Sequence, residues 1–173
     1  GNFTLSMEHF EKALSVYDHE RHFDDAFRYA QNPGVAMRCF AAWALWFLGY
    51  PDCALNRMQE ALALARELSE PHVLAPALFF ASILHQLRQE QQMAQELADA
   101  AIAVSNEHGL VLYQAMATIT RNWALTAQGR QEEAIEQMRQ GLAAYQATGT
   151  EVIRPHFLAL LSEALIRARK LDE

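Results

Sequence analysis

The sequence predicts an all-α protein built as a solenoid of antiparallel helix hairpins, and three observations indicate this fold. Ala and Leu dominate a chain that is 51% hydrophobic, while the β-branched residues that favour strands are sparse. Apolar residues recur at three- and four-residue intervals, as they do along one face of a helix. The pattern then repeats every 40 residues, which is typical of stacked helix pairs and not of one closed core.

The repeat is visible when Ala54, Ala94 and Ala134 are aligned, because both intervals are 40 residues. Small residues on these helices let helix axes approach closely, so a large side chain at such a position would separate them. A half-unit at the start of the chain shows the same pattern, with eight extra residues before the next unit. Four further rows keep the spacing: Ala61, Ala101 and Gly141; Leu62, Ile102 and Leu142; Trp43, Ile83 and Trp123; and Met58, Ala98 and Met138.

We therefore expect a single domain over residues 1–173, divided into stacked units. The chain is expected to start in a second helix and to stop in a first helix, as an excised fragment would. The expected units are an incomplete first unit 1–32, complete units 33–71, 72–109 and 110–149, and an incomplete last unit 150–173.

Turn residues mark where the helices begin and end. Asn32 is suited to cap a helix that has Pro33 in its first position. The segment Gly49-Tyr50-Pro51-Asp52 reads as a tight turn, and Gly109 and Gly149 stand where a left-handed C-terminal cap is needed. Loops this short make neighbouring helices antiparallel. The expected helices are Phe3–Tyr17, Pro33–Leu48, Asp52–Leu68, His72–Arg88, Gln92–Ser105, Leu110–Gln128, Gln131–Tyr145 and Glu151–Lys170.

The charge balance argues against nucleic-acid binding. The formal net charge is −7, and no basic stripe runs along the chain. The cluster Arg167, Arg169 and Lys170 lies at the end of an expected helix, where it complements the helix dipole. We therefore expect no nucleic-acid partner.

The cysteines and the hydropathy predict a cytoplasmic protein that does not span a membrane. Cys39 and Cys53 both fall inside expected helices and are interpreted as free thiols. The most apolar stretch, Cys39–Leu48, is too short to cross a bilayer. No secretory signal is recognised.

No catalytic motif is present, and the chain is not expected to be an enzyme or to hold a cofactor or a metal. Phosphate-binding loops, a nucleophile elbow and the His-Glu-x-x-His and Cys-x-x-Cys motifs are all missing from the sequence. His19, His22, Asp24 and Asp25 form the densest set of metal-ligating side chains, but their spacing matches no standard site. We interpret this set as a solvated connecting segment.

One spacing resembles a known family. Gly49, Ala54 and the pair Ala61-Leu62 match the glycine, alanine and alanine-leucine signature of the tetratricopeptide repeat. The signature returns at Gly129, Ala134 and Gly141-Leu142, whereas Gln89 replaces the glycine in the middle unit. The resemblance implies a right-handed, tetratricopeptide-like solenoid. The period of 40 exceeds the usual ~34 residues, so a HEAT-type repeat is the alternative fold.

A narrower resemblance extends over most of the chain. The stretches 32–35, 44–51, 60–65 and 139–142 are similar to the C-terminal tetratricopeptide region of large bacterial signalling proteins. Those proteins often carry a nucleotide-cyclase domain and a predicted ATPase domain upstream. The resemblance implies that any catalytic domain lies outside these residues.

The tetratricopeptide resemblance also implies where a partner would bind. In that family the first helix of each pair lines the concave surface. The aligned rows here are Cys39, Trp43 and Trp46; Phe79, Ile83 and Gln86; and Ile119 and Trp123. Arg38, Arg121 and Asn122 are polar residues close to this groove, and the lysines of a carboxylate clamp are missing. The alternative is that Trp43 and Trp123 are buried inside the solenoid.

Three functions remain open on the sequence alone. The first is a scaffold for protein–protein interaction, or for intramolecular regulation, that binds a peptide or a domain in the groove. The second is a sensor that binds an apolar small molecule. The third is a structural spacer that forms homodimers through exposed terminal helices, since an uncapped solenoid end presents core surface.

Overall fold

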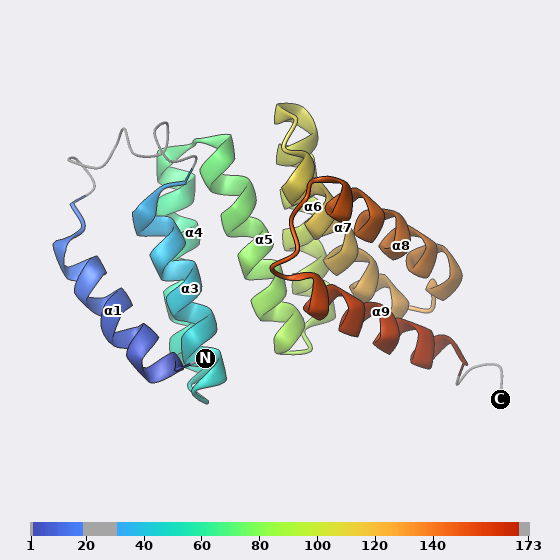
Figure 1. Cartoon of the computed structure of the whole chain (residues 1–173), viewed down its shortest axis with the longest axis horizontal. Coiled ribbons are helices and arrows are strands. Elements are labelled where there is room, and N and C mark those ends of the chain that lie inside the picture. Colours follow the sequence, from blue (N-terminus) through green and yellow to red (C-terminus); the bar gives the residue numbers. More distant parts are fainter. Residues whose placement is uncertain (1, 19–30, 170–173) are drawn as a thin grey trace.

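The structure, a computed structural model, describes residues 2–18 and 31–169. Over these residues the chain is helical throughout, with no strand, and the expected all-α class is confirmed (Figure 1). The expected set His19, His22, Asp24 and Asp25 and the end of the basic cluster at Lys170 lie outside the described residues. The helices are α1 (Phe3–Val16), α3 (Pro33–Phe47), α4 (Pro51–Leu68), α5 (Pro71–Leu87), α6 (Gln91–His108), α7 (Val111–Thr126), α8 (Gln131–Ala147) and α9 (Arg154–Arg169).

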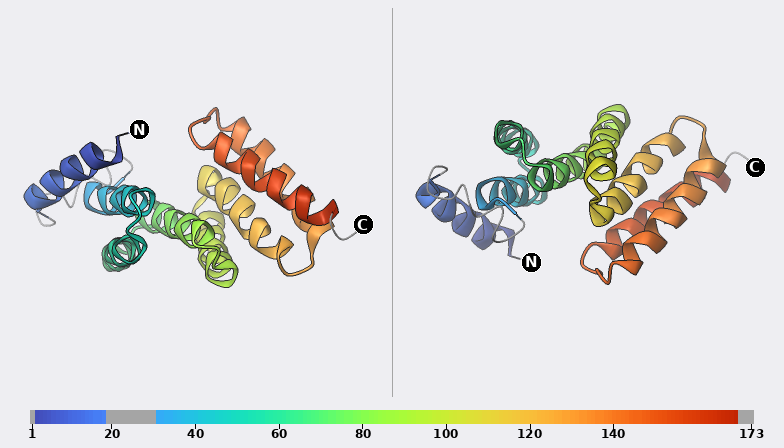
Figure 2. Two further views of the ribbon diagram at one scale, coloured as in Figure 1. Left: turned by 90° about the horizontal axis from the view of Figure 1, so that it is seen from below. Right: turned by 90° about the horizontal axis from the view of Figure 1, so that it is seen from above.

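The helices stack as successive hairpins. Helices α3 and α4, α5 and α6, and α7 and α8 pack as pairs, and the first helices α3, α5, α7 and α9 also contact one another in sequence order. Helix α1 packs on α3 at one end, and α9 packs on α7 and α8 at the other. Both α1 and the α8–α9 pair lie on the same side of the α3–α5 row (Figure 2). This side is the concave side of the solenoid.

The small residues of the repeat lie where helices of a pair touch. Ala54, Ala94 and Ala134 are almost fully buried. At Gly141 a methyl group would meet Ile119 Cγ1 at 2.9 Å and the Ala115 carbonyl oxygen at 3.2 Å, so α7 and α8 are in close contact there. The 40-residue spacing of small residues therefore reflects close helix packing.

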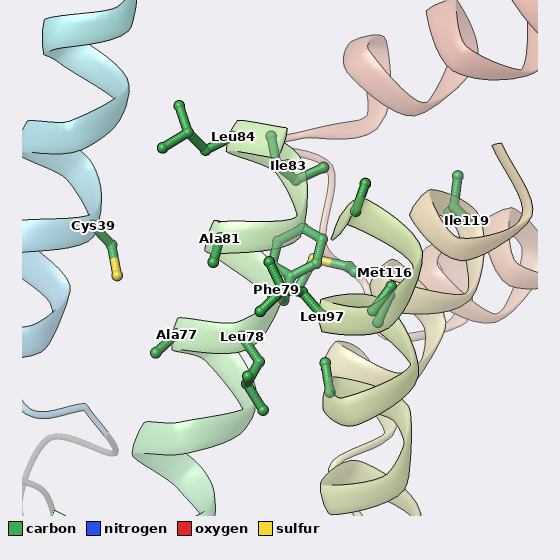
Figure 3. Packing of buried hydrophobic residues seen from close by; sticks show 14 of the residues in the cluster. Cys39, Ala77, Leu78, Phe79, Ala81, Ile83, Leu84, Leu97, Met116 and Ile119 are labelled. Atoms are coloured by element: carbon green, nitrogen blue, oxygen red, sulfur yellow. The ribbon is translucent and has the colours of Figure 1, made fainter. Parts of the chain in front are cut away.

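The core runs continuously through the stacked units. Phe79 of α5 lies toward Leu97 of α6 and Met116 of α7, and all three side chains are buried (Figure 3). Further along, Tyr145 and Phe157 meet edge to face, with ring centroids 5.2 Å apart. Each unit thus buries its apolar face against its neighbours, as expected of a repeat protein.

The turn between α5 and α6 departs from the repeat because it has no glycine. Gln89 occupies the left-handed region with φ of 60°, where Gly49 and Gly129 stand in the neighbouring units. The Glu90 carboxylate next to it pairs with His85 Nδ1 at 2.5 Å and with Arg88 Nε at 2.8 Å. Burial raises the pKa of Glu90, but the hydrogen bonds from His85 and Arg88 outweigh burial and hold the pKa below its usual value. These bonds hold the backbone in the left-handed turn that a glycine adopts without strain in the neighbouring units.

Helix α1 is attached to α3 largely by aromatic stacking. Phe3 stacks on Phe47 with ring centroids 4.9 Å apart, and Phe10 stacks on Phe40 at 6.4 Å. At the end of α1, the Tyr17 hydroxyl donates to Asn32 Oδ1 at 3.0 Å. None of the residues of α1 is fully buried, so the helix contacts the solenoid without entering its core.

Candidate partner-binding surface on the concave side

The structure places most of the predicted groove residues in the core. Seven of the eleven are buried: Cys39, Phe79, Ile83, Gln86, Ile119, Asn122 and Trp123. These seven positions therefore belong to the core, and the binding groove stays a prediction. Most of these residues are buried because they lie on the faces of α5 and α7 that contact neighbouring helices, as Ile119 does at Gly141.

Trp123 is buried because α9 covers it. Its side chain is 0% exposed, and Nε1 donates to Glu163 Oε2 of α9 at 3.0 Å. Arg167 of α9 bonds Glu163 Oε1 and lies over the Trp123 ring, with its guanidinium carbon 5.6 Å from the ring centroid. The concave face of α7 is thus closed by α9, and burial of Trp123 is the outcome that the alternative interpretation foresaw.

The four remaining predicted residues are partly exposed. Trp43 lies on the concave side, with Nε1 donating to the Phe80 carbonyl oxygen at 3.2 Å, and Trp46 packs at the edge of the core. Arg38 donates to the Gly34 carbonyl oxygen at 2.9 Å. Arg121 of α7 pairs with Asp99 at 2.5 Å, so its guanidinium group faces α6. Of the predicted aromatic residues, Trp43 is thus the one that contributes most clearly to an accessible concave surface.

Sequence reasoning missed three aromatic residues beside Trp43. Phe40 is 39% exposed and Phe47 is 54% exposed, and Phe80 of α5 is half-buried. Phe40 and Phe80 meet at 5.1 Å between centroids, and Trp43 and Phe80 at 4.7 Å. The signal was available, because residues 40, 43 and 47 share one helix face and Phe80 follows Phe40 by one period. We call Phe40, Trp43, Phe47 and Phe80 the concave aromatic cluster.

A hollow lies at each end of this cluster. The first, with a volume of only about 20 Å³, lies between the N-terminal halves of α3 and α5 and includes Asn32, Cys39 and His72. We call the second the His156 hollow. Its volume is about 140 Å³, it opens to solvent, and its lining is Trp43, Phe47, Ile83, Leu87, Ile153 and His156.

Two of the polar groups in the first hollow are committed to structural roles. Asn32 Oδ1 accepts from the Val35 amide at 3.1 Å and so caps α3, as the sequence predicts. Burial raises the pKa of the Cys39 thiol to about 12, so the thiol is protonated and unreactive near neutral pH. Cys53 is exposed, and both cysteines are free.

The described residues include no group of three or more His, Cys, Asp and Glu side chains placed to hold a metal ion. In the same part of the chain, no helix is both long and apolar enough to cross a membrane.

Comparison with known proteins supports the fold. No family model matches the chain, and no curated protein matches it in sequence. A solved structure described as a Rap protein complexed with Competence and Sporulation Factor superimposes with a TM-score of 0.70 at 18% sequence identity. The match covers 98% of this chain and 49% of that one, so the chain spans about half the length of this structural neighbour. The solenoid is therefore a tetratricopeptide-like helical repeat.

Proposed function

We propose that the chain is a protein-interaction scaffold that binds a peptide or a protein domain on its concave side. The observation that carries the proposal is the concave aromatic cluster, in which four aromatic side chains lie together and Phe40 and Phe47 remain exposed. Aromatic side chains are enriched at protein interfaces and dominate their energetics. The structural neighbour is described in complex with a factor, which is consistent with a binding role for this fold.

The partner is expected to supply apolar side chains. The cluster and the His156 hollow are lined mainly by Phe, Trp, Ile and Leu. Arg38, a polar residue of α3, donates to the Gly34 carbonyl oxygen of its own helix. An apolar segment of a peptide, or of another domain of the same protein, fits these contacts. The proposal includes the wider context suggested by the sequence, in which this unit regulates a larger bacterial signalling protein in the cytoplasm.

The test is capture of partners from a lysate and from the separately expressed neighbouring domains. The wild-type chain is compared with a Phe40→Gln/Phe47→Gln double variant. The matched control is Met93→Gln, because Met93 is 43% exposed and lies on α6, away from the cluster. A partner held by the wild type and the control but lost by the double variant supports the proposal. Equal capture by all three chains moves the interface elsewhere, and no capture by any of them rejects the scaffold.

A self-associating spacer is a second candidate, and α9 carries it. Leu158 and Ile166 are exposed on α9, which packs on α7 and α8 and is followed by no further helix among the described residues. Pairing of two copies through α9 would cover them. Sedimentation of the wild type beside a Leu158→Gln/Ile166→Gln variant tests this: a dimer that the variant loses supports pairing, and a monomer at high concentration rejects it.

A further inference from the structure

The His156 hollow has walls that are held in place before any ligand arrives. Trp43 is fixed by its hydrogen bond to the Phe80 carbonyl oxygen, at 3.2 Å. Phe47 is stacked on Phe3 of α1, with the two rings 19° from parallel. Ile83 of α5, the helix that faces α3 across the hollow, is buried in the core. A pocket with fixed walls loses little side-chain entropy on binding, which favours a small rigid ligand.

One polar side chain, His156, lies in this apolar lining. Its Nε2 atom is buried and makes no hydrogen bond in the described structure. Burial lowers the pKa of His156, so the imidazole is neutral at pH 7. A buried polar atom without a partner is unfavourable, and a ligand that supplies the partner gains that difference. Rotation about χ2 of a histidine is soft, so the ring can turn toward a ligand.

We propose that the His156 hollow binds a small aromatic molecule that carries one hydroxyl group, of the phenol class. The hydroxyl follows from His156: a hydroxyl both donates and accepts, so it pairs with Nε2 in either neutral tautomer, whereas a carbonyl oxygen pairs with one. The aromatic ring follows from Trp43 and Phe47, whose rings offer stacking or edge contacts. Size is compatible, since an apolar cavity of about 150 Å³ accommodates benzene, and this hollow has a similar volume of about 140 Å³ and opens to solvent on one side.

This assignment goes beyond the proposed scaffold function and is separable from it. A small molecule in the hollow would contact Trp43 and Phe47, which also belong to the concave aromatic cluster. A phenol bound there would therefore compete with a protein partner, or be presented to it. Direct binding of the small molecule can succeed or fail whatever lysate capture shows.

The experiment is calorimetric titration of the whole chain with three probes of similar size: p-cresol, toluene and 4-methylcyclohexanol. We expect p-cresol to bind about tenfold more tightly than toluene, which is the effect of one hydrogen bond, and more tightly than the non-aromatic alcohol. The ¹⁵N resonance of His156 Nε2 should shift when p-cresol binds. Absence of saturable p-cresol binding, equal affinity for p-cresol and toluene, equal affinity for p-cresol and the cyclic alcohol, or an unchanged His156 resonance each overturns the proposal.

Variants locate the effect. His156→Phe keeps a ring of similar size and should remove the tenfold preference while toluene still binds. His72→Phe is the matched control, because His72 lines the other hollow, and it should keep the preference. Leu87→Trp should fill the hollow and abolish binding of all three probes. N-acetyl-tyrosinamide separates the two sources of a phenol: binding of this probe without binding of p-cresol would assign the hollow to a tyrosine side chain and reject a free ligand. Circular dichroism confirms that each variant is folded. If a variant does not fold, the His156 resonance of the wild-type chain still tests whether p-cresol binds next to this residue.

Discussion

The attachment of α9 to α7 gives a quantitative prediction. Glu163→Leu removes the acceptor of the Trp123 indole, which is 0% exposed and has no access to water. A buried donor left unpaired costs about 1–3 kcal/mol. The same change leaves Arg167 beside the ring without its carboxylate partner at 2.5 Å. We expect Glu163→Leu to lower the free energy of unfolding by about 2–3 kcal/mol, which lies at the upper end of the range usual for single substitutions.

A double-mutant cycle with Trp123→Phe separates the hydrogen bond from other effects of the change. Phenylalanine has no N–H group, so the penalty of Glu163→Leu should be smaller in that background, with a coupling of about 1–2 kcal/mol. Urea unfolding followed by circular dichroism measures the four chains, and hydrogen exchange of the α9 amides reports the helix directly. Additive effects of the two substitutions, with unchanged exchange in α9, would show that the Trp123–Glu163 bond does not hold this helix.

The remaining predictions concern the turn and the helix contacts of the middle unit. Gln89→Gly should raise the free energy of unfolding by about 0.5–1 kcal/mol, because φ of 60° is strained for glutamine and natural for glycine; an unchanged or lower urea midpoint would contradict this. Ala94→Leu should cost about 1–3 kcal/mol by overpacking the fully buried contact of α6, whereas Met93→Leu on its exposed face should be nearly neutral in the same assay. Since the pKa of Glu90 is lowered on folding, its contribution is complete above the ordinary carboxyl pKa and is lost as pH falls through that range. The drop in the urea midpoint between pH 7 and pH 3 should therefore be smaller in Glu90→Gln, and an equal drop in both chains would contradict the assignment.

The fold could be predicted from the sequence because helical repeats leave local signals. The 40-residue spacing of Ala54, Ala94 and Ala134 reports close helix contacts, and Asn32 and Gly49 mark a helix start and a turn. Helix boundaries agree with the expected ones to within three residues. These features depend only on contacts within one unit or with the next unit. Such contacts recur in every unit, so the sequence repeats them at a regular spacing.

The candidate site could not be predicted in the same way, because exposure depends on where α9 lies. Trp43 and Trp123 occupy equivalent positions of the repeat, but Trp43 remains accessible and Trp123 is buried against Glu163. Periodicity treats the two as identical. The placement of His156 next to Trp43 and Ile83 likewise joins residues more than 70 positions apart, for which the sequence pattern gives no signal.

The different settings of the tryptophans have an optical consequence. Trp123 is shielded from solvent and hydrogen-bonded to a carboxylate. Its fluorescence emission maximum should therefore be blue-shifted, and aqueous quenchers should not reduce its intensity. Trp43, in the lining of the His156 hollow, and Trp46, at the edge of the core, are partly exposed and therefore reachable by such quenchers. A molecule that arrives on the concave side would alter the quenchable part of the spectrum and leave the shielded part unchanged. The chain therefore contains, without any added label, both a reporter of occupancy and an internal reference for it.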